Sequence, residues 1–277
     1  MLPTKSICYK FSEIQYSTGI LQGCIDATYV IHLEGNGRYK NIIDQLEMYN
    51  PSKIVYIVFN KGYTNCEKLK NIATPAQDLI DAFLQIFKHS NSKNYNNILI
   101  LEDDFIFNEQ IKQKTHIKSI CDFVNARENE DFQYMLGCIP YIKMPCSINL
   151  NHYINKCSTG THACIYSKLN REKMLNEKFE NITDWDLYSS LYNKRYMYYF
   201  PLCYQLFPET ENSKKWGEHN LFWFYFSKIT LFVFRLLKLD TQVEPGYSFF
   251  YKFSNIFPCL LLILGLYLLY KLSIKIM

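Results

Sequence analysis

The chain of 277 residues has few glycines and few prolines, 10 and 9 respectively. No internal repeat and no low-complexity segment interrupts it. The high content of Tyr, Phe, Ile, Asn and Lys is typical of an AT-rich coding sequence and carries no functional weight. The composition excludes a disordered chain and indicates a globular enzyme, and the length suffices for one large domain or one domain with an appendage.

A strong charge of either sign is also missing. The formal net charge is +4, and no run of Lys or Arg appears outside the last quarter of the chain. Nucleic-acid-binding domains carry clustered basic residues on one face. The sequence therefore argues against nucleic acid as a partner and directs attention to small substrates.

Paired metal-binding or redox cysteines are absent as well. The 10 cysteines show no C-x-x-C or zinc-type spacing, and several lie in apolar runs such as MLGCIP and HACIY. This pattern favours buried, reduced thiols in a cytosolic-facing protein. The even number of cysteines still leaves disulfides open.

The N-terminal segment lacks the continuous apolar stretch of a signal peptide, whereas the C-terminal segment is strongly apolar. Residues 253–277 contain the run Ile256 to Tyr270 and predict a transmembrane anchor of roughly 20 residues. Residues 217–252 predict an amphipathic membrane-interface segment, since Lys228 and Arg235 share one helical face. The expected localisation is therefore membrane-anchored, with a cytosolic-facing catalytic domain; the alternative for the interface segment is a core helix.

Between an N-terminal extension, 1–26, and the C-terminal segments, the spacing of apolar residues predicts a catalytic domain over residues 27–216. Short apolar runs alternate with helical periodicity in the order strand, helix, strand, helix, strand, over Ala27–Leu33, Ile42–Tyr49, Lys53–Asn60, Thr74–His89 and Leu99–Phe105. Such alternation predicts an α/β fold with a mainly parallel sheet and helices on both faces.

The last of these strands ends in three consecutive carboxylates, Glu102, Asp103 and Asp104. Carboxylates at the carboxyl end of a buried strand lie where α/β sheets bind ligands, and their oxygens suit Mg²⁺ or Mn²⁺. This placement predicts a metal-bridged diphosphate of a nucleotide-sugar. The alternative is a helix N-terminus whose acidic residues cap amides or face solvent.

Several motifs together resemble a known family. They are, in order, YVIHLEGNGR, LILEDDF, STGTHACIYSKLNREKML, DWDL and YQLFPETENS. This order resembles family 25 glycosyltransferases, the lipopolysaccharide and collagen galactosyltransferase type, and is most similar to members from large DNA viruses. The resemblance spans residues 27–216 and implies a GT-A-like, Rossmann-type fold that uses a UDP-sugar. The helix TPAQDLIDAF lacks the family's Ser-His pattern, and the acidic triplet begins with Glu rather than Asp.

Transfer from a nucleoside diphosphate builds negative charge on the leaving group, which a clamped Mn²⁺ or Mg²⁺ stabilises as a Lewis acid. Asp104 is the expected direct ligand. Asp103 or Glu102 would bind through water or contact the ribose. The resemblance further implies that His162 reaches the same cation, or else the acceptor; the alternative is a histidine bonded to a neighbouring loop.

An inverting transferase also needs a base for the acceptor hydroxyl. Asp184 and Asp186 begin a predicted helix and diverge by about 200 degrees around it, so only one should face the cleft. Asp186 is the expected base, and Trp185 would be available to stack on a sugar. The alternative is a pair of carboxylates that stabilises the helix N-terminus.

Other residues are expected to bind the nucleotide. Leu33 and Arg38 match the positions where such enzymes hold the base, although a loop arginine is more often solvated. The segment FPETENSKKW would close over the diphosphate, with Lys214 or Lys215 supplying positive charge.

The sequence thus predicts a membrane-tethered glycosyltransferase that moves a sugar to a glycan or protein acceptor. Two alternatives remain. One is a catalytically silent relative that binds a glycan or a partner, and the other is a metal-dependent phosphatase or nuclease built on the same carboxylates.

Overall fold

The computed structural model of the protein describes residues 8–68, 72–208 and 221–276. Its centre is a seven-stranded sheet in the order β1-β3-β2-β4-β7-β6-β8. The strands of this sheet are β1 Tyr9–Gln15, β2 Ala27–Leu33, β3 Ile54–Asn60, β4 Asn97–Glu102, β6 Phe132–Pro145, β7 His152–Ser167 and β8 Lys194–Tyr198. A two-stranded sheet pairs β5 Phe105–Phe107 with β9 Cys203–Gln205.

The central sheet is mixed but mostly parallel. Strands β2, β3, β4, β6 and β8 point the same way, whereas β1 and β7 run against their neighbours. The predicted first three strands are all present. Beyond them, β6 and β7 pair as one long antiparallel hairpin.

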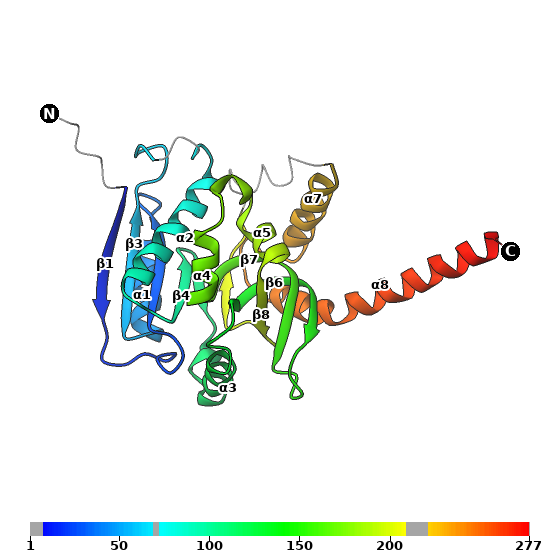
Figure 1. The fold of residues 1–277 in the computed structure, drawn as a ribbon, viewed down its shortest axis with the longest axis horizontal. Coiled ribbons are helices and arrows are strands. Elements are labelled where there is room, and N and C mark those ends of the chain that lie inside the picture. Colours follow the sequence, from blue (N-terminus) through cyan, green and yellow to red (C-terminus); the bar gives the residue numbers. More distant parts are fainter. Residues whose placement is uncertain (1–7, 69–71, 209–220, 277) are drawn as a thin grey trace.

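Helices lie on both faces of this sheet (Figure 1). They are α1 Tyr39–Tyr49, α2 Pro75–Ser92, α3 Lys114–Asn125, α4 Lys168–Leu175, α5 Trp185–Tyr192, α7 Leu221–Leu236 and α8 Gly246–Ile276, with 3-10 turns at Glu109–Lys112 and Phe179–Asn181. Apolar residues of α1 and α3 share one core, and those of α2, α4, α5, α7 and α8 share the other.

Local sequence explains why these elements form where they do. In β4, Ile98 and Ile100 enter one core while Leu99 and Leu101 enter the other, as expected for a strand covered on both faces. Helix α2 begins after Thr74, whose hydroxyl accepts a hydrogen bond from the N–H of Gln77 at 3.2 Å, with Pro at the first helical position.

The expected membrane segments are a wrong prediction. Within the described residues, no helix combines the length and the apolar character needed to cross a membrane. Helix α8 starts at Gly246, before the supposed anchor, and its first turns bury Tyr247, Phe250 and Tyr251 in the domain core. Phe234 of α7 is buried in the same core. Apolar residues of the expected interface segment, namely Phe234, Tyr247, Phe250 and Tyr251, therefore pack in the core of the domain.

The N-terminal extension also contributes to the domain, because β1 forms the edge of the sheet beside β3. Four of the cysteines expected to be reduced are paired instead. Cys8 is bonded to Cys66 and Cys24 to Cys121, with Cα–Cα distances of 5.6 and 4.8 Å.

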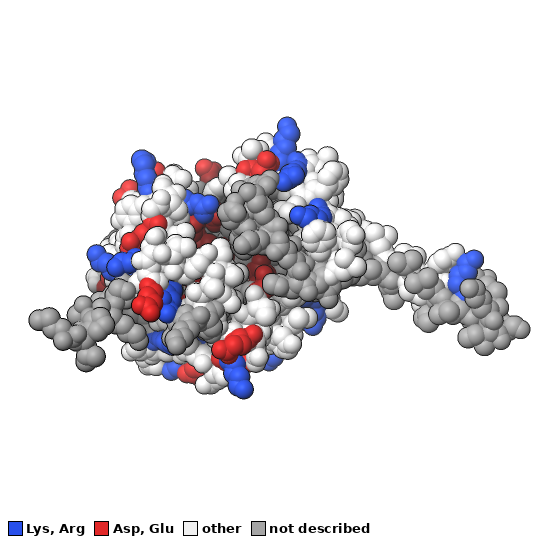
Figure 2. Space-filling model, turned by 90° about the horizontal axis from the view of Figure 1, so that it is seen from above, with Lys and Arg blue, Asp and Glu red and all other residues white. Residues whose placement is uncertain are grey.

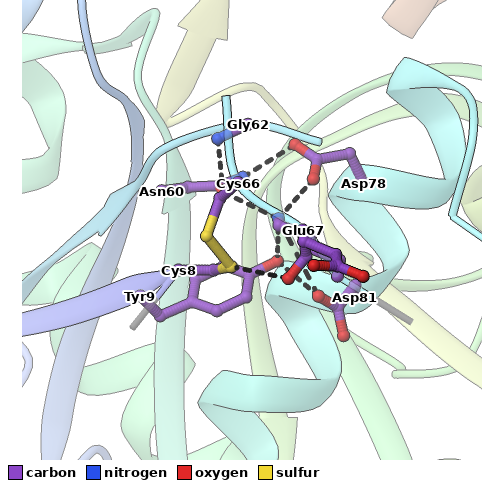
Figure 3. The surroundings of a disulfide bond; sticks show 9 residues. Cys8, Tyr9, Asn60, Gly62, Cys66, Glu67, Asp78 and Asp81 are labelled. Carbon is purple, nitrogen blue, oxygen red and sulfur yellow. Dashed lines mark hydrogen bonds and ion pairs between the residues drawn. A yellow bond between two sulfur atoms is a disulfide. The ribbon is translucent and has the colours of Figure 1, made fainter. Parts of the chain in front are cut away.

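The Cys8–Cys66 bond lies next to a buried charged group (Figure 3). Lys68 forms an ion pair with Asp78, and its ammonium group also lies 3.8 Å from the carboxylate of Asp81. It donates further hydrogen bonds to Tyr9 at 2.5 Å and to the Asn60 side chain at 2.8 Å. The loop after β3 is thus attached both to β1 and to the first turns of α2.

Candidate functional site

The acidic triplet lies at the carboxyl end of β4. Glu102 is the last residue of this strand, and Asp103 and Asp104 form the turn before β5. The parallel strands β2 and β3 end at the same edge, which is the upper side of Figure 1. Figure 2 looks onto this side and shows acidic side chains in the interior of the face as well as at its rim.

The loop after β2 folds over the triplet. Gly35 and Gly37 have φ of +83° and +77°, a conformation that glycine adopts without strain, and they let the loop curl back. The Asn36 side chain and the Leu33 N–H both donate hydrogen bonds to Asp103, the latter at 3.2 Å. Of the two expected nucleotide-binding residues, Leu33 therefore contacts the triplet through its backbone.

Arg38 contacts the triplet through its side chain. Its guanidinium Nη1 lies 2.5 Å from Oδ1 of Asp103 and 3.0 Å from Oδ2 of Asp104. Its side chain is about one-third exposed, at 35%. The Arg38 side chain thus bridges two of the three carboxylates and remains partly exposed to solvent.

Glu102 and Asp104 share a second neighbour, Gln205 at the end of β9. Its amide nitrogen donates to Asp104 at 2.8 Å and to Glu102 at 3.5 Å. Burial raises the pKa of Asp104 to about 6, although Arg38 opposes the shift. Burial also raises the pKa of Glu102 well above its usual value, and the charges of Asp104, Asp186 and Asp103 raise it further.

Asp186 belongs to the same group of carboxylates, as its effect on Glu102 indicates. It lies in the first turn of α5 and accepts a hydrogen bond from the N–H of Gly160 at 2.8 Å. Burial and the nearby charge of Asp184 raise its pKa to about 6. Asp184 itself is exposed and caps α5 by accepting from the N–H of Leu187 at 2.8 Å.

His162 is fully buried two residues after Gly160. Its Nε2 lies 3.3 Å from the carbonyl oxygen of Cys203, and its Nδ1 has no hydrogen-bond partner within the described part of the chain. Burial lowers its pKa to about 4, so the imidazole is neutral at pH 7. The contact with Cys203 places His162 beside the first residue of β9.

Trp185 lies in the core, where a sugar does not reach. Its side chain is 4% exposed, stacks on Phe83 with ring centroids 4.4 Å apart, and donates from Nε1 to the hydroxyl of Tyr166 at 3.1 Å. The expectation that Trp185 stacks on a sugar is therefore wrong. Lys214 and Lys215, expected to contact the diphosphate, lie outside the described residues.

The structure adds site residues that were not predicted. Asn36 and Gln205 both lie within motifs of the family resemblance, EGNGR and YQLF. The sequence pattern around an amide side chain does not indicate which residues it contacts. Thr161 donates to Glu102 at 3.4 Å, and His32 Nδ1 lies 3.9 Å from Asp103. Burial lowers the pKa of His32 despite the nearby carboxylate.

The acidic group differs from a preformed metal centre. Among the residues that the structure describes, no three His, Cys, Asp or Glu side chains form a group that could hold a metal ion. Arg38 forms ion pairs with both Asp103 and Asp104. The arrangement is a set of half-buried, mutually repelling carboxylates neutralised in part by one arginine.

No protein-family model and no curated protein sequence matches the chain. Solved structures do align with it, including a glycosyltransferase involved in the glycosylation of the major capsid of PBCV-1, with a TM-score of 0.39 and 9% identity over 66% of this chain and 94% of that one. A protein from STIV aligns with a TM-score of 0.36 and 15% identity, over 65% of this chain and 85% of the other. Alignments at this level assign no activity, and membership of family 25 stays a prediction.

Proposed function

We propose that the protein is a glycosyltransferase that takes its sugar from a nucleoside diphosphate, with a UDP-sugar as the expected donor. The observation that carries the proposal is the meeting of Glu102, Asp104 and Asp186 at the carboxyl edge of the sheet, with Arg38 across the group. Buried carboxylates that raise one another's pKa are costly to the fold and are typical of functional sites. The edge itself is where α/β sheets bind nucleotides.

The donor atoms suit a hard divalent cation, Mn²⁺ or Mg²⁺, because all of them are oxygens and several carry poorly compensated charge. The described side chains do not form a ready-made metal site while Arg38 bonds to Asp103 and Asp104. With Arg38 moved away, Asp104 would hold such a cation, with Asp103 or Glu102 beside it. Bound there, the cation would neutralise charge that develops on the leaving diphosphate. Arg38 now occupies the same oxygens, so it and a cation compete for them.

This competition gives Arg38 a role with the nucleotide. A guanidinium displaced from two carboxylates retains its donors, and paired donors in a fixed plane match phosphate oxygens. Arg38 is the N-cap residue of α1. Its side chain is partly exposed, so it is able to turn toward a ligand in the solvent. Arg38 would then bind the diphosphate directly.

Asp186 supplies the base. Its pKa of about 6 leaves the carboxylate ionised at pH 7 but basic enough to accept a proton from an attacking hydroxyl. The Gly160 N–H orients one of its oxygens, and the Thr161 hydroxyl also interacts with this carboxylate. Attack opposite to the diphosphate inverts the sugar's configuration.

The proposal is tested by screening the hydrolysis of several UDP-sugars with Mn²⁺, and by the shift of the melting temperature with UDP and Mn²⁺. The wild type should hydrolyse at least one donor slowly and be stabilised by the pair of ligands. Asp104→Asn should lose both effects, whereas Asp44→Asn, an exposed carboxylate paired with Lys40, should keep them. A wild type that neither hydrolyses a donor nor shifts with any nucleoside diphosphate would overturn the proposal.

A further inference from the structure

The side chain of Gln205 donates hydrogen bonds to Glu102 and Asp104. The position of Gln205 therefore affects the orientation of these two carboxylates. Gln205 is the last residue of β9, and its amide nitrogen reaches Asp104 and Glu102 at 2.8 and 3.5 Å. Because β9 has only three residues, the position of the Gln205 amide depends on how well the backbone at the end of the strand is held. What fixes this backbone therefore affects the carboxylates.

One hydroxyl group holds both backbone polar groups of Gln205. The Tyr247 hydroxyl accepts a hydrogen bond from the Gln205 N–H at 2.9 Å and donates one to the Gln205 carbonyl oxygen at 3.2 Å. Tyr247 is fully buried in the first turn of α8. Its ring packs edge-on against His162 and Tyr204, with centroids 6.2 and 5.0 Å apart.

Two more contacts join the same segments. The N–H of Phe207 donates to the carbonyl oxygen of Leu239 at 2.8 Å, and the hydroxyl of Tyr204 donates to the Glu244 carboxylate at 3.2 Å. The residues on both sides of Gln205 are therefore held by the segment that leads into α8. Tyr247, in the first turn of α8, contacts Gln205 itself.

We propose that Tyr247 is a positioning residue for the transfer reaction, which acts by fixing the backbone of Gln205 and, through its amide, the orientation of Glu102 and Asp104. The inference rests on the proposed function. It makes the start of α8 part of the catalytic unit.

Without the hydroxyl, the N–H and the carbonyl of Gln205 lose a partner that holds both, and the end of β9 is free to shift. Displacements of about 1 Å at a catalytic group are able to cost up to roughly a hundredfold in rate. Because charge develops on the diphosphate in the transition state, misplaced carboxylates should lower kcat more than they raise the KM of the donor.

The test compares Tyr247→Phe with Tyr251→Phe. Both variants remove one hydroxyl from a buried tyrosine of α8 and keep the ring, but the Tyr251 hydroxyl lies 3.9 Å from the sulfur of Cys138 and not at Gln205. Donor hydrolysis is measured well below the melting temperature of each protein. Tyr247→Phe should lower kcat roughly tenfold with less than about a twofold change in donor KM, and Tyr251→Phe should leave both unchanged.

A double variant distinguishes positioning from general stability. If Tyr247 acts through Gln205, Tyr247→Phe should cost no further activity in a Gln205→Leu background, whereas a general loss of stability would add to it. Additive losses, or equal activity of Tyr247→Phe and the wild type, would overturn the inference and leave the proposed function standing. A wild type that hydrolyses no donor would overturn the proposed function, and the inference with it.

Discussion

The carboxylate of Asp186 accepts a hydrogen bond from the backbone N–H of Gly160 at 2.8 Å. This contact joins the first turn of α5 to β7, whose next residues are Thr161 and His162. Gly160 has φ of +83°, so the turn in the strand that presents its N–H favours glycine. A residue predicted from one motif is thus held by another motif 26 positions earlier in the chain.

The raised pKa of Asp186 predicts that replacing this residue increases stability and lowers activity. Burial raises this pKa from 3.8 to about 6, so the ionised form destabilises the folded protein above pH 6, and the cost disappears as the pH falls to about 4. Asp186→Asn should therefore be more stable than the wild type at pH 7.5, by up to about 3 kcal/mol, while losing at least about a hundredfold in activity. The gain should vanish near pH 4.

Denaturant titrations of both proteins at pH 7.5, 6 and 4.5 measure this difference. Taking the difference cancels the opposite pH dependence of buried neutral histidines such as His162. Asp44→Asn is the control, because this carboxylate is exposed and pairs with Lys40. A difference between wild type and Asp186→Asn that does not change with pH would refute the prediction.

Arg38 should have opposite effects on the two expected ligands. Since its guanidinium bonds to Asp103 and Asp104, Arg38→Gln should strengthen the binding of Mn²⁺ alone by about tenfold, because charge-assisted hydrogen bonds no longer compete. The same change should weaken UDP binding in the presence of Mn²⁺. Titration calorimetry measures both, with Arg127→Gln, an arginine that packs on Phe123, as the control. Weaker binding of Mn²⁺ to Arg38→Gln would contradict competition.

The buried Lys68 should stabilise the fold strongly. Its side chain is 3% exposed and lies between Asp78 and Asp81, so Lys68→Met leaves two buried carboxylates without their cation. We expect a loss of about 3 to 5 kcal/mol in the free energy of unfolding. Lys40→Met removes an exposed ion pair with Asp44 and should cost less than about 1 kcal/mol. Equal losses in the two variants, measured by urea denaturation, would be inconsistent with this description.

Truncation should separate the two parts of α8. A chain ending at Val243 lacks Tyr247, Phe250 and Tyr251, whose burial contributes about 1.5 to 3 kcal/mol each, and should be unfolded or strongly destabilised. A chain ending at Asn255 keeps these residues and should fold cooperatively. Circular dichroism and thermal melts compare them. A stable, cooperative fold of the shorter chain would show that α8 is dispensable for the core.

Much of the first half of the fold follows from local pattern. The strands at Ala27–Leu33 and Ile54–Asn60, the helix that begins at Pro75 and the acidic end of β4 all follow from runs of apolar residues, turn residues and caps that act over a few positions. The mostly parallel sheet with helices on both faces follows from their alternation. The carboxylates at the sheet edge were therefore predictable as a group.

By itself, then, the sequence determined the core strands, the helix starts and the placement of Glu102, Asp103 and Asp104. Only the tertiary structure decided that Trp185 packs on Phe83, that Arg38 bridges two of these carboxylates, and that the first turns of α8 pack on the core and hold Gln205 through Tyr247. The physical reason is that apolar and amide side chains have no local preference for one partner. Apolar side chains such as Phe234 and Tyr247 suit a lipid bilayer or a protein core, and only the folded structure places these two in the core.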